Sequence, residues 1–141
     1  MTDKYNLERF VTAQEHDYKT ALAEVRAGRK RSHWMWYIFP QIKGLGFSDT
    51  ARFYAIKNLQ EAADYLSHPI LGARLMEICG ALLGHKDTSA SQIFGNPDDL
   101  KLRSSMTLFA EVEGADPIFA KVLERFYSSR KDDRTIAILD R

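Results

Sequence analysis

The feature that most constrains the fold is an apolar pattern with steps of three and four residues, which recurs along the whole chain. Its first instance comprises Leu7, Phe10, Val11, Tyr18, Ala21, Leu22 and Val25. Because a helix turns once every 3.6 residues, this spacing places these side chains on one helical face. We expect a helix here, with Asn6 as its N-cap and Gly28 as the left-handed residue that ends it.

The same spacing recurs in later segments, between residues that typically begin or end helices. Ser32 and Ser48 are expected to cap helices, and Pro69 suits a first helical position. The pairs Asn96-Pro97 and Asp116-Pro117 are further start signals. Helices are predicted at residues 33–39, 48–56, 59–66, 69–83, 97–112 and 117–127, with a short helical turn at 89–94. Residues 135–139 form either a last helical turn or an extended tail.

These patterns predict an all-α fold, a compact multihelical bundle of about seven helices. No linker, repeat or low-complexity stretch divides the 141 residues, a length that fits one domain. We therefore expect a single domain over residues 1–141.

Charge and cysteine usage limit the environment of the chain. Twenty basic residues against 19 acidic ones indicate no bulk attraction to nucleic acid or to a membrane. The one cysteine, Cys79, excludes an internal disulfide and favours a reducing compartment. The longest apolar run, residues 34–39, is far shorter than the roughly 20 residues that span a bilayer. We expect a cytoplasmic protein with no membrane partner.

Sequence signatures of familiar catalytic and metal sites do not occur. The four histidines lack metal-ligand spacing, so we expect no metal site and no cofactor. There is no Gly-Lys-Ser/Thr phosphate loop and no Gly-x-Ser-x-Gly nucleophile motif. Cys79 lies among Leu75, Ile78 and Leu82, which indicates a buried thiol that packs as a small hydrophobe.

Residues 26–48 combine positive charge with aromatic rings. They include five basic residues, no acidic ones and five aromatics. Charge beside stacking rings suits a planar ligand that carries a phosphate. The alternative is that the rings belong to the core and the basic residues form a solvated loop, because large aromatics dominate core packing. A strand is the alternative to a helix at residues 33–39, since aromatics suit strands.

Residues 96–109 place hydroxyls in the middle of a predicted helix. Ser104, Ser105 and Thr107 are poor helix formers, so their hydroxyls either bond to carbonyls one turn earlier or line a polar pocket. Lys101 shares a helical face with Ser104 and Ser105.

Three long segments resemble one known family. They are GRKRSHWMWYIFPQ at residues 28–41, HPILGARL at 68–75 and IFGNPDDLKLRSSMTLF at 93–109. Together they resemble the hallmark segments of domain of unknown function 1810, a mainly bacterial family, over about residues 7–139. The resemblance implies an α-helical single domain without an established activity, and therefore carries over no catalytic residue.

We expect residues 26–48 and 96–109 to meet in one polar site. His33 is the candidate general acid or base, because histidine exchanges protons near neutral pH. The candidate ligand-binding residues are Arg29, Lys30, Trp34, Gln41, Lys101, Ser104 and Ser105. The expected partner is an anionic, nucleotide-like small molecule, bound by a binding protein or an enzyme.

Two other functions stay open. One is a module that binds a protein or single-stranded nucleic acid through the basic–aromatic surface, although nucleic acid is the less favoured partner because no charge stripe runs along the chain. The other is a structural domain without an active site. A concave site would favour the small ligand, and a convex patch would favour the module.

Overall fold

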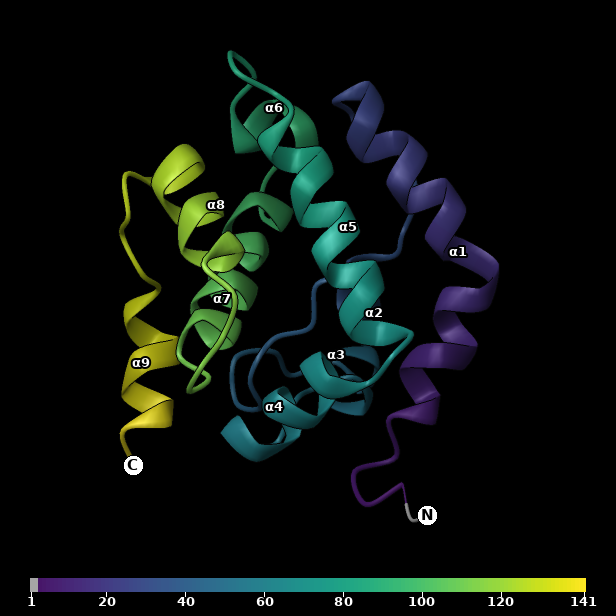
Figure 1. Ribbon diagram of the computed structural model, residues 1–141, viewed down its shortest axis with the longest axis vertical. Helices are drawn as coiled ribbons and strands as arrows, with labels where there is room; N and C mark the ends of the chain where they lie inside the picture. Colours follow the sequence, from purple (N-terminus) through teal and green to yellow (C-terminus); the bar gives the residue numbers. More distant parts are fainter. Residues whose placement is uncertain (1–2) are drawn as a thin grey trace.

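The computed structural model describes residues 3–141, and within them the fold is all-α, as predicted (Figure 1). The nine helices in this part of the chain are α1 (Glu8–Ala27), α2 (Met35–Ile38), α3 (Asp49–Phe53), α4 (Leu59–Ser67), α5 (Leu71–Leu83), α6 (Ala90–Phe94), α7 (Asp98–Ala110), α8 (Ile118–Tyr127) and α9 (Asp133–Leu139).

The expected number of about seven helices is too low because two short segments are complete helices. Ser89 and Gln92 form a reciprocal capping box at α6, and the Asp132 carboxylate accepts the Thr135 N–H at the start of α9. These caps satisfy amide groups that would otherwise lack partners. Short helices of this kind depend on their caps more than on an apolar period.

Helix α5 lies at the centre of the arrangement, between α1 on one side and α8 on the other (Figure 1). Helix α4 packs against both α5 and α7, and α7 in turn contacts α6, α8 and α9. The short helix α2 packs against α1. Segments far apart in the sequence therefore meet around α7.

Of the two predicted ends of the first helix, one needs correction and the other is confirmed. Asn6 is not the N-cap of α1 but adopts a left-handed conformation with φ of 57°. The Asp3 carboxylate caps the helix instead, accepting the N–H groups of Leu7 at 2.7 Å and Glu8 at 2.9 Å. At the other end Gly28 is left-handed, with φ of 81°, as predicted.

Three further start signals lie near the observed boundaries without acting as predicted. Helix α2 begins after Trp34, and the Ser32 hydroxyl donates to Glu24 Oε2 at 2.6 Å instead of capping. Helix α5 begins two residues beyond Pro69. The N-cap of α7 is Pro97 and no side chain caps this helix; the Asp99 N–H donates to the Gly95 carbonyl at 2.9 Å.

Buried apolar side chains from most of the helices form one cluster. The buried residues of this cluster include Phe10, Leu22, Leu75, Leu82, Phe109 and Val122, whereas Phe126 is only partly buried. Aromatic rings link the helices across this cluster. Tyr65 of α4 packs 5.2 Å from Phe10 of α1 and 5.3 Å from Phe109 of α7, measured between ring centroids.

An isolated parallel bridge between Ile42 and Ile56 joins the loops that follow α2 and α3. The Lys43 N–H donates to the Ile56 carbonyl at 2.8 Å, and the Ile56 N–H donates to the Gln41 carbonyl at 2.9 Å. Both isoleucines are buried. The bridge therefore fixes the register of two loops that contain no regular structure of their own.

No single helix within residues 3–141 has the length and apolar character needed to cross a membrane; α4 and α5 reach that composition only as a pair that bends by 87° at its junction.

We predict that Phe109→Ala will lower the free energy of unfolding by about 3–5 kcal/mol, because it removes a fully buried ring and leaves a cavity beside Tyr65 and Phe119. Chemical denaturation measures this change. Phe47→Ala is the control, since the Phe47 ring is 70% exposed and its loss is expected to change stability by no more than about 0.5 kcal/mol. Equal effects of the two substitutions would contradict the packing described here.

We predict that Cys79 will react slowly with a thiol reagent in the native protein and quickly in denaturant. Its thiol is buried beside the Met106 sulfur at 3.6 Å, and burial raises its pKa because a thiolate would be desolvated. Ellman's reagent, with and without urea, measures the two rates. Equal rates would show that the thiol is accessible.

Candidate functional site

Glu24 of α1 organises the basic–aromatic segment. Its Oε1 accepts hydrogen bonds from the N–H groups of Arg31 at 2.8 Å and Ser32 at 3.0 Å, and from the Trp34 indole at 2.9 Å. Its Oε2 accepts the Ser32 hydroxyl. One carboxylate thus holds the chain from residue 31 to residue 34 against the first helix.

This arrangement removes Trp34 from the set of ligand-binding residues. Trp34 is 1% exposed, and its ring packs against Phe39 and Phe94, each 6.2 Å away between centroids. Glu24 supplies the indole N–H with a partner, so the ring can be buried without losing a hydrogen bond. The alternative interpretation of residues 26–48, in which the aromatic rings belong to the core, is therefore correct for Trp34.

The basic residues of this segment also differ from the prediction. Lys30 is buried against Trp34, and its ammonium pairs with Asp98 at 3.0 Å, so its charge joins the two segments and is already neutralised. Arg29 and His33 are exposed. Neither is among the described residues that line a cleft with Ser104, so the structure does not bring His33 into one site with that hydroxyl.

Residues 26–48 and 96–109 nevertheless meet across a cleft of about 650 Å³, here called the Trp36 cleft. The earlier segment contributes Trp36, Gln41 and residues 45–48, and the later one contributes Pro97, Leu100, Lys101, Arg103 and Ser104. Asp132 and Arg134, at the start of α9, complete the wall together with Ala51. Of the predicted ligand-binding residues, Gln41, Lys101 and Ser104 lie in this cleft.

Positive charge predominates in the Trp36 cleft. Lys101 lies 5.3 Å from the centroid of the Trp36 ring and 3.4 Å from Asp98. Arg103 donates to the carbonyls of residues 130 and 131, at 2.9 and 2.8 Å, and so holds the chain leading to α9. Arg134 is exposed and makes no side-chain hydrogen bond within the described part of the chain.

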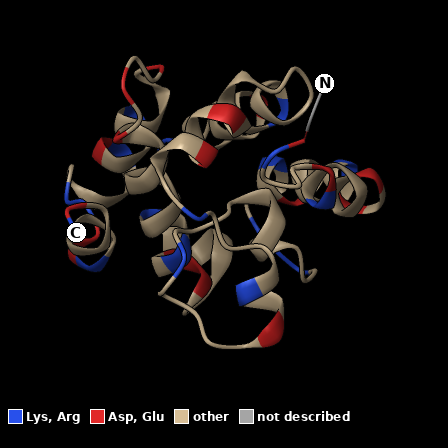
Figure 2. Cartoon of the chain, turned by 90° about the horizontal axis from the view of Figure 1, so that it is seen from below, with Lys and Arg blue, Asp and Glu red and all other residues tan. Residues whose placement is uncertain are grey.

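Asp132 is the acidic residue of this wall, and its carboxylate is already satisfied. Its Oδ2 accepts the Ser104 hydroxyl at 3.1 Å and both the N–H and the hydroxyl of Thr135, at 3.1 and 2.6 Å. An anion in the cleft would therefore meet a carboxylate whose charge three donors already stabilise. Figure 2 shows that elsewhere Lys and Arg alternate with Asp and Glu along the helices, without a face of one sign in this view.

The hydroxyls of α7 have separate roles. Ser104 donates to the Leu100 carbonyl at 3.2 Å as well as to Asp132, and Thr107 donates to the Arg103 carbonyl at 2.8 Å. Both therefore bond back by one turn, the commoner of the two explanations. Ser105 is buried, and its hydroxyl lacks a partner among residues 3–141 and lines no part of the cleft. A ligand-binding role for Ser105 is not supported by its position.

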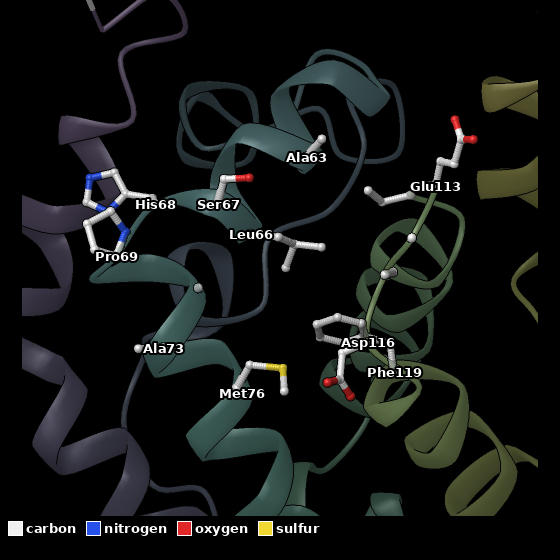
Figure 3. Close-up of a pocket in the computed structure, with 14 residues that line it drawn as sticks. Ala63, Leu66, Ser67, His68, Pro69, Ala73, Met76, Glu113, Asp116 and Phe119 are labelled. Atoms are coloured by element: carbon white, nitrogen blue, oxygen red, sulfur yellow. The ribbon is translucent and has the colours of Figure 1, made fainter. Parts of the chain in front are cut away.

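A second cleft, of about 490 Å³, lies between the α4–α5 turn and the loop between α7 and α8 (Figure 3). Leu66, Met76 and Phe119 give it an apolar wall. Its polar groups do not converge: the His68 ring and the Glu113 carboxylate lie at opposite edges of the view in Figure 3. His68 Nδ1 accepts the Ile70 N–H at 3.1 Å, and Asp116 accepts the Ile118 N–H at 2.8 Å, so both side chains already bind amide groups at the starts of α5 and α8.

Within the described chain no three His, Cys, Asp or Glu side chains are grouped to hold a metal ion. The Trp36 cleft brings together charge, an aromatic ring, a hydroxyl and an amide group from the two predicted segments. The predicted ligand-binding residues did not include Trp36, although the apolar spacing of residues 34–39 indicates where it lies. Trp34, Met35, Ile38 and Phe39 follow steps of three and four and are buried, which leaves Trp36 on the other face.

The fold and its sequence define an all-α protein of unknown function. A family model described as "Protein of unknown function (DUF1810)" matches residues 4–139, and the chain belongs to this family. It is also similar to the crystal structure of the conserved hypothetical protein Rv1873 from Mycobacterium tuberculosis, with 48% identity, 99% of each chain covered and a TM-score of 0.96. A search of curated proteins finds no match.

We predict that Glu24→Gln will flatten the acid side of the stability profile. Burial alone would raise the pKa of Glu24, but hydrogen bonds from Ser32, Arg31 and Trp34 lower it from 4.5 to about 2. Because the pKa is lower in the folded state, this carboxylate stabilises the fold above about pH 4.5, and the contribution is lost as the pH falls from about 4.5 to about 2.

Urea unfolding at a series of pH values measures the effect. The wild-type protein is expected to lose more stability over this pH range than Glu24→Gln does. Glu15→Gln is the matched control, because it removes an exposed carboxylate from the same helix. Parallel profiles for wild type and Glu24→Gln would contradict the role given to Glu24.

Proposed function

We propose that the Trp36 cleft binds a small organic anion with a planar group, the chemistry of a nucleotide. The observation that carries this proposal is the position of the Lys101 ammonium 5.3 Å from the Trp36 ring, inside a cleft that also contains Arg103, Arg134 and Gln41. In such a pair the cation can bind a phosphate, and the aromatic face can stack on a planar ring of the ligand.

Exposed apolar surface at the same place supports a bound organic group. Phe47 is 70% exposed and Leu100 is 51% exposed, and both line the Trp36 cleft. Large apolar side chains exposed at a concave surface are typical of binding sites. Gln41 adds an amide that can both donate and accept a hydrogen bond, as the edge of a base requires.

The shape of the site favours a small ligand over the interaction module. A cleft of about 650 Å³ lies within the range of roughly 300–1,000 Å³ that small-molecule sites occupy. Burial of Trp34 and pairing of Lys30 with Asp98 also remove one ring and one cation from the basic–aromatic surface that such a module would present. His33 has no role in the proposal, because it lies outside the described lining of the cleft.

We also propose a cytoplasmic location. The chain has one cysteine, so it can form no internal disulfide, and this cysteine is buried in the fold. Proteins of this size in oxidising compartments commonly rely on disulfides. A tagged full-length chain, followed by fractionation, tests the location.

We predict that adenosine 5′-monophosphate will shift the Trp36 indole resonance in a nitrogen–proton NMR titration. The Trp34 indole, which is buried and bonded to Glu24, is an internal reference and is expected to shift little. Adenosine alone and inorganic phosphate alone are each expected to bind more weakly, because each uses one half of the site.

Lys101→Gln is expected to weaken binding of adenosine 5′-monophosphate by about tenfold or more, since it removes a charge-assisted contact. Lys121→Gln, an exposed lysine of α8, is the matched control and is expected to bind like the wild type. Absence of a Trp36 shift with every nucleoside monophosphate would contradict the proposal. Tight, Lys101-dependent binding of a labelled single-stranded oligonucleotide without binding of the mononucleotides would favour the interaction module.

A further inference from the structure

A third, smaller cleft lies where the N-terminal turn meets the loops after α2 and α3. Its volume is about 280 Å³, and we call it the Lys43 cleft. It is lined by Tyr5, Asn6, Arg9, Lys43, Arg52, Phe53, Ala55 and Lys57. Four of these described residues are basic and none is acidic, and the set shares no residue with the Trp36 cleft.

The parallel bridge between Ile42 and Ile56 accounts for the position of the two lysines. Successive side chains of an extended chain point to opposite sides. Because Ile42 and Ile56 both point into the core, the residues that follow them, Lys43 and Lys57, both point to solvent from neighbouring chain segments. Arg52 of α3 joins them in the lining of the same cleft. The fold thus brings together cations that are far apart in the sequence.

Arg9 differs from the other three basic residues because its guanidinium is fully used. It donates to the carbonyls of Tyr5, Asn6, Phe53 and Ala55 and to Glu61. Glu61 is completely buried and accepts from Arg9 and from the Lys57 N–H, at 2.8 Å in each case. Arg9 and Glu61 therefore compensate each other beneath the cleft and leave its surface charge to the lysines and Arg52.

Lys43, Arg52 and Lys57 make no side-chain hydrogen bond and no ion pair within residues 3–141, and all three are exposed. Like charges that share a small cleft repel one another, and these three make no structural contact that offsets the repulsion. Lys30 and Arg103, by contrast, are fixed by partners in the fold. The unpaired cluster is what an anion-binding surface requires.

We propose that the Lys43 cleft binds a phosphate-bearing anion, in the form of a phosphomonoester or a diphosphate. A space of about 280 Å³ suits such a group and is smaller than ordinary sites for whole organic ligands. An arginine can bind two phosphate oxygens at once, and two lysines add charge. Phe53, which is 56% exposed at the rim, offers an apolar contact to the organic part of the ligand.

The test uses the full chain and sodium pyrophosphate as the probe. Backbone NMR resonances of residues 43 and 52–57 are expected to shift in a saturable manner. Lys43→Gln/Lys57→Gln is expected to weaken binding by about 100-fold, or about tenfold for each ammonium removed. Lys19→Gln/Lys121→Gln is the matched control: it removes the same charge from exposed lysines of α1 and α8 and is expected to change binding by no more than about twofold.

Three outcomes would overturn the proposal: shifts that do not saturate, equal loss in the two double variants, or an oligonucleotide that binds at residues 43 and 52–57 when pyrophosphate does not. The last result would assign the cleft to a nucleic-acid backbone. Lys101→Gln separates this proposal from the proposed function, because it alters the Trp36 cleft and is expected to leave pyrophosphate shifts at residues 43 and 52–57 unchanged.

Discussion

A buried ion pair between Arg9 and Glu61 joins the first helix to α4 beneath the Lys43 cleft. The two groups lie 2.8 Å apart, and the Glu61 side chain is completely buried. Through the remaining donors of Arg9 the pair also fixes the end of α3. Loss of either partner would leave an uncompensated charge in the interior, which typically lowers the free energy of unfolding by about 3–5 kcal/mol.

Two other carboxylates hold irregular chain in the same way. Glu24 accepts four donors from residues 31–34, and Asp132 accepts Ser104 and Thr135 while its own N–H donates to Thr107. Because loops lack a hydrogen-bond ladder of their own, their amide groups need such acceptors. Asp132 lies in the wall of the Trp36 cleft, and Glu24 holds the chain that leads into α2 and Trp36. The shape of this cleft therefore depends on carboxylates whose hydrogen bonds are already made within the fold.

Local patterns predicted most of the helices and the core, because apolar spacing and Gly28 act within a few residues of the structures they determine. The candidate site was predicted less well. Trp34 and Lys30 lie beside other candidate binding residues in the sequence. In the fold, however, Glu24, ten residues before Trp34, accepts the indole N–H, and Asp98 of α7 pairs with Lys30. Arg103 and Asp132 could not be assigned to the site from the sequence, since the contacts that place them there, Arg103 with residue 130 and Asp132 with Ser104, span more than 20 residues.

The basic residues of this chain thus separate into two kinds by their partners. Arg9, Lys30, Arg103 and Arg125 donate to carbonyls or carboxylates of distant segments and act as connections within the fold. Lys43, Arg52, Lys57 and Arg134 lie at clefts, with no side-chain partner among the described residues. A run of basic residues in the sequence, such as 29–31, does not distinguish these kinds. The distinction appears only when the fold shows which charges already have partners, and Lys101 has both features, since it pairs with Asp98 at 3.4 Å and also lines the Trp36 cleft.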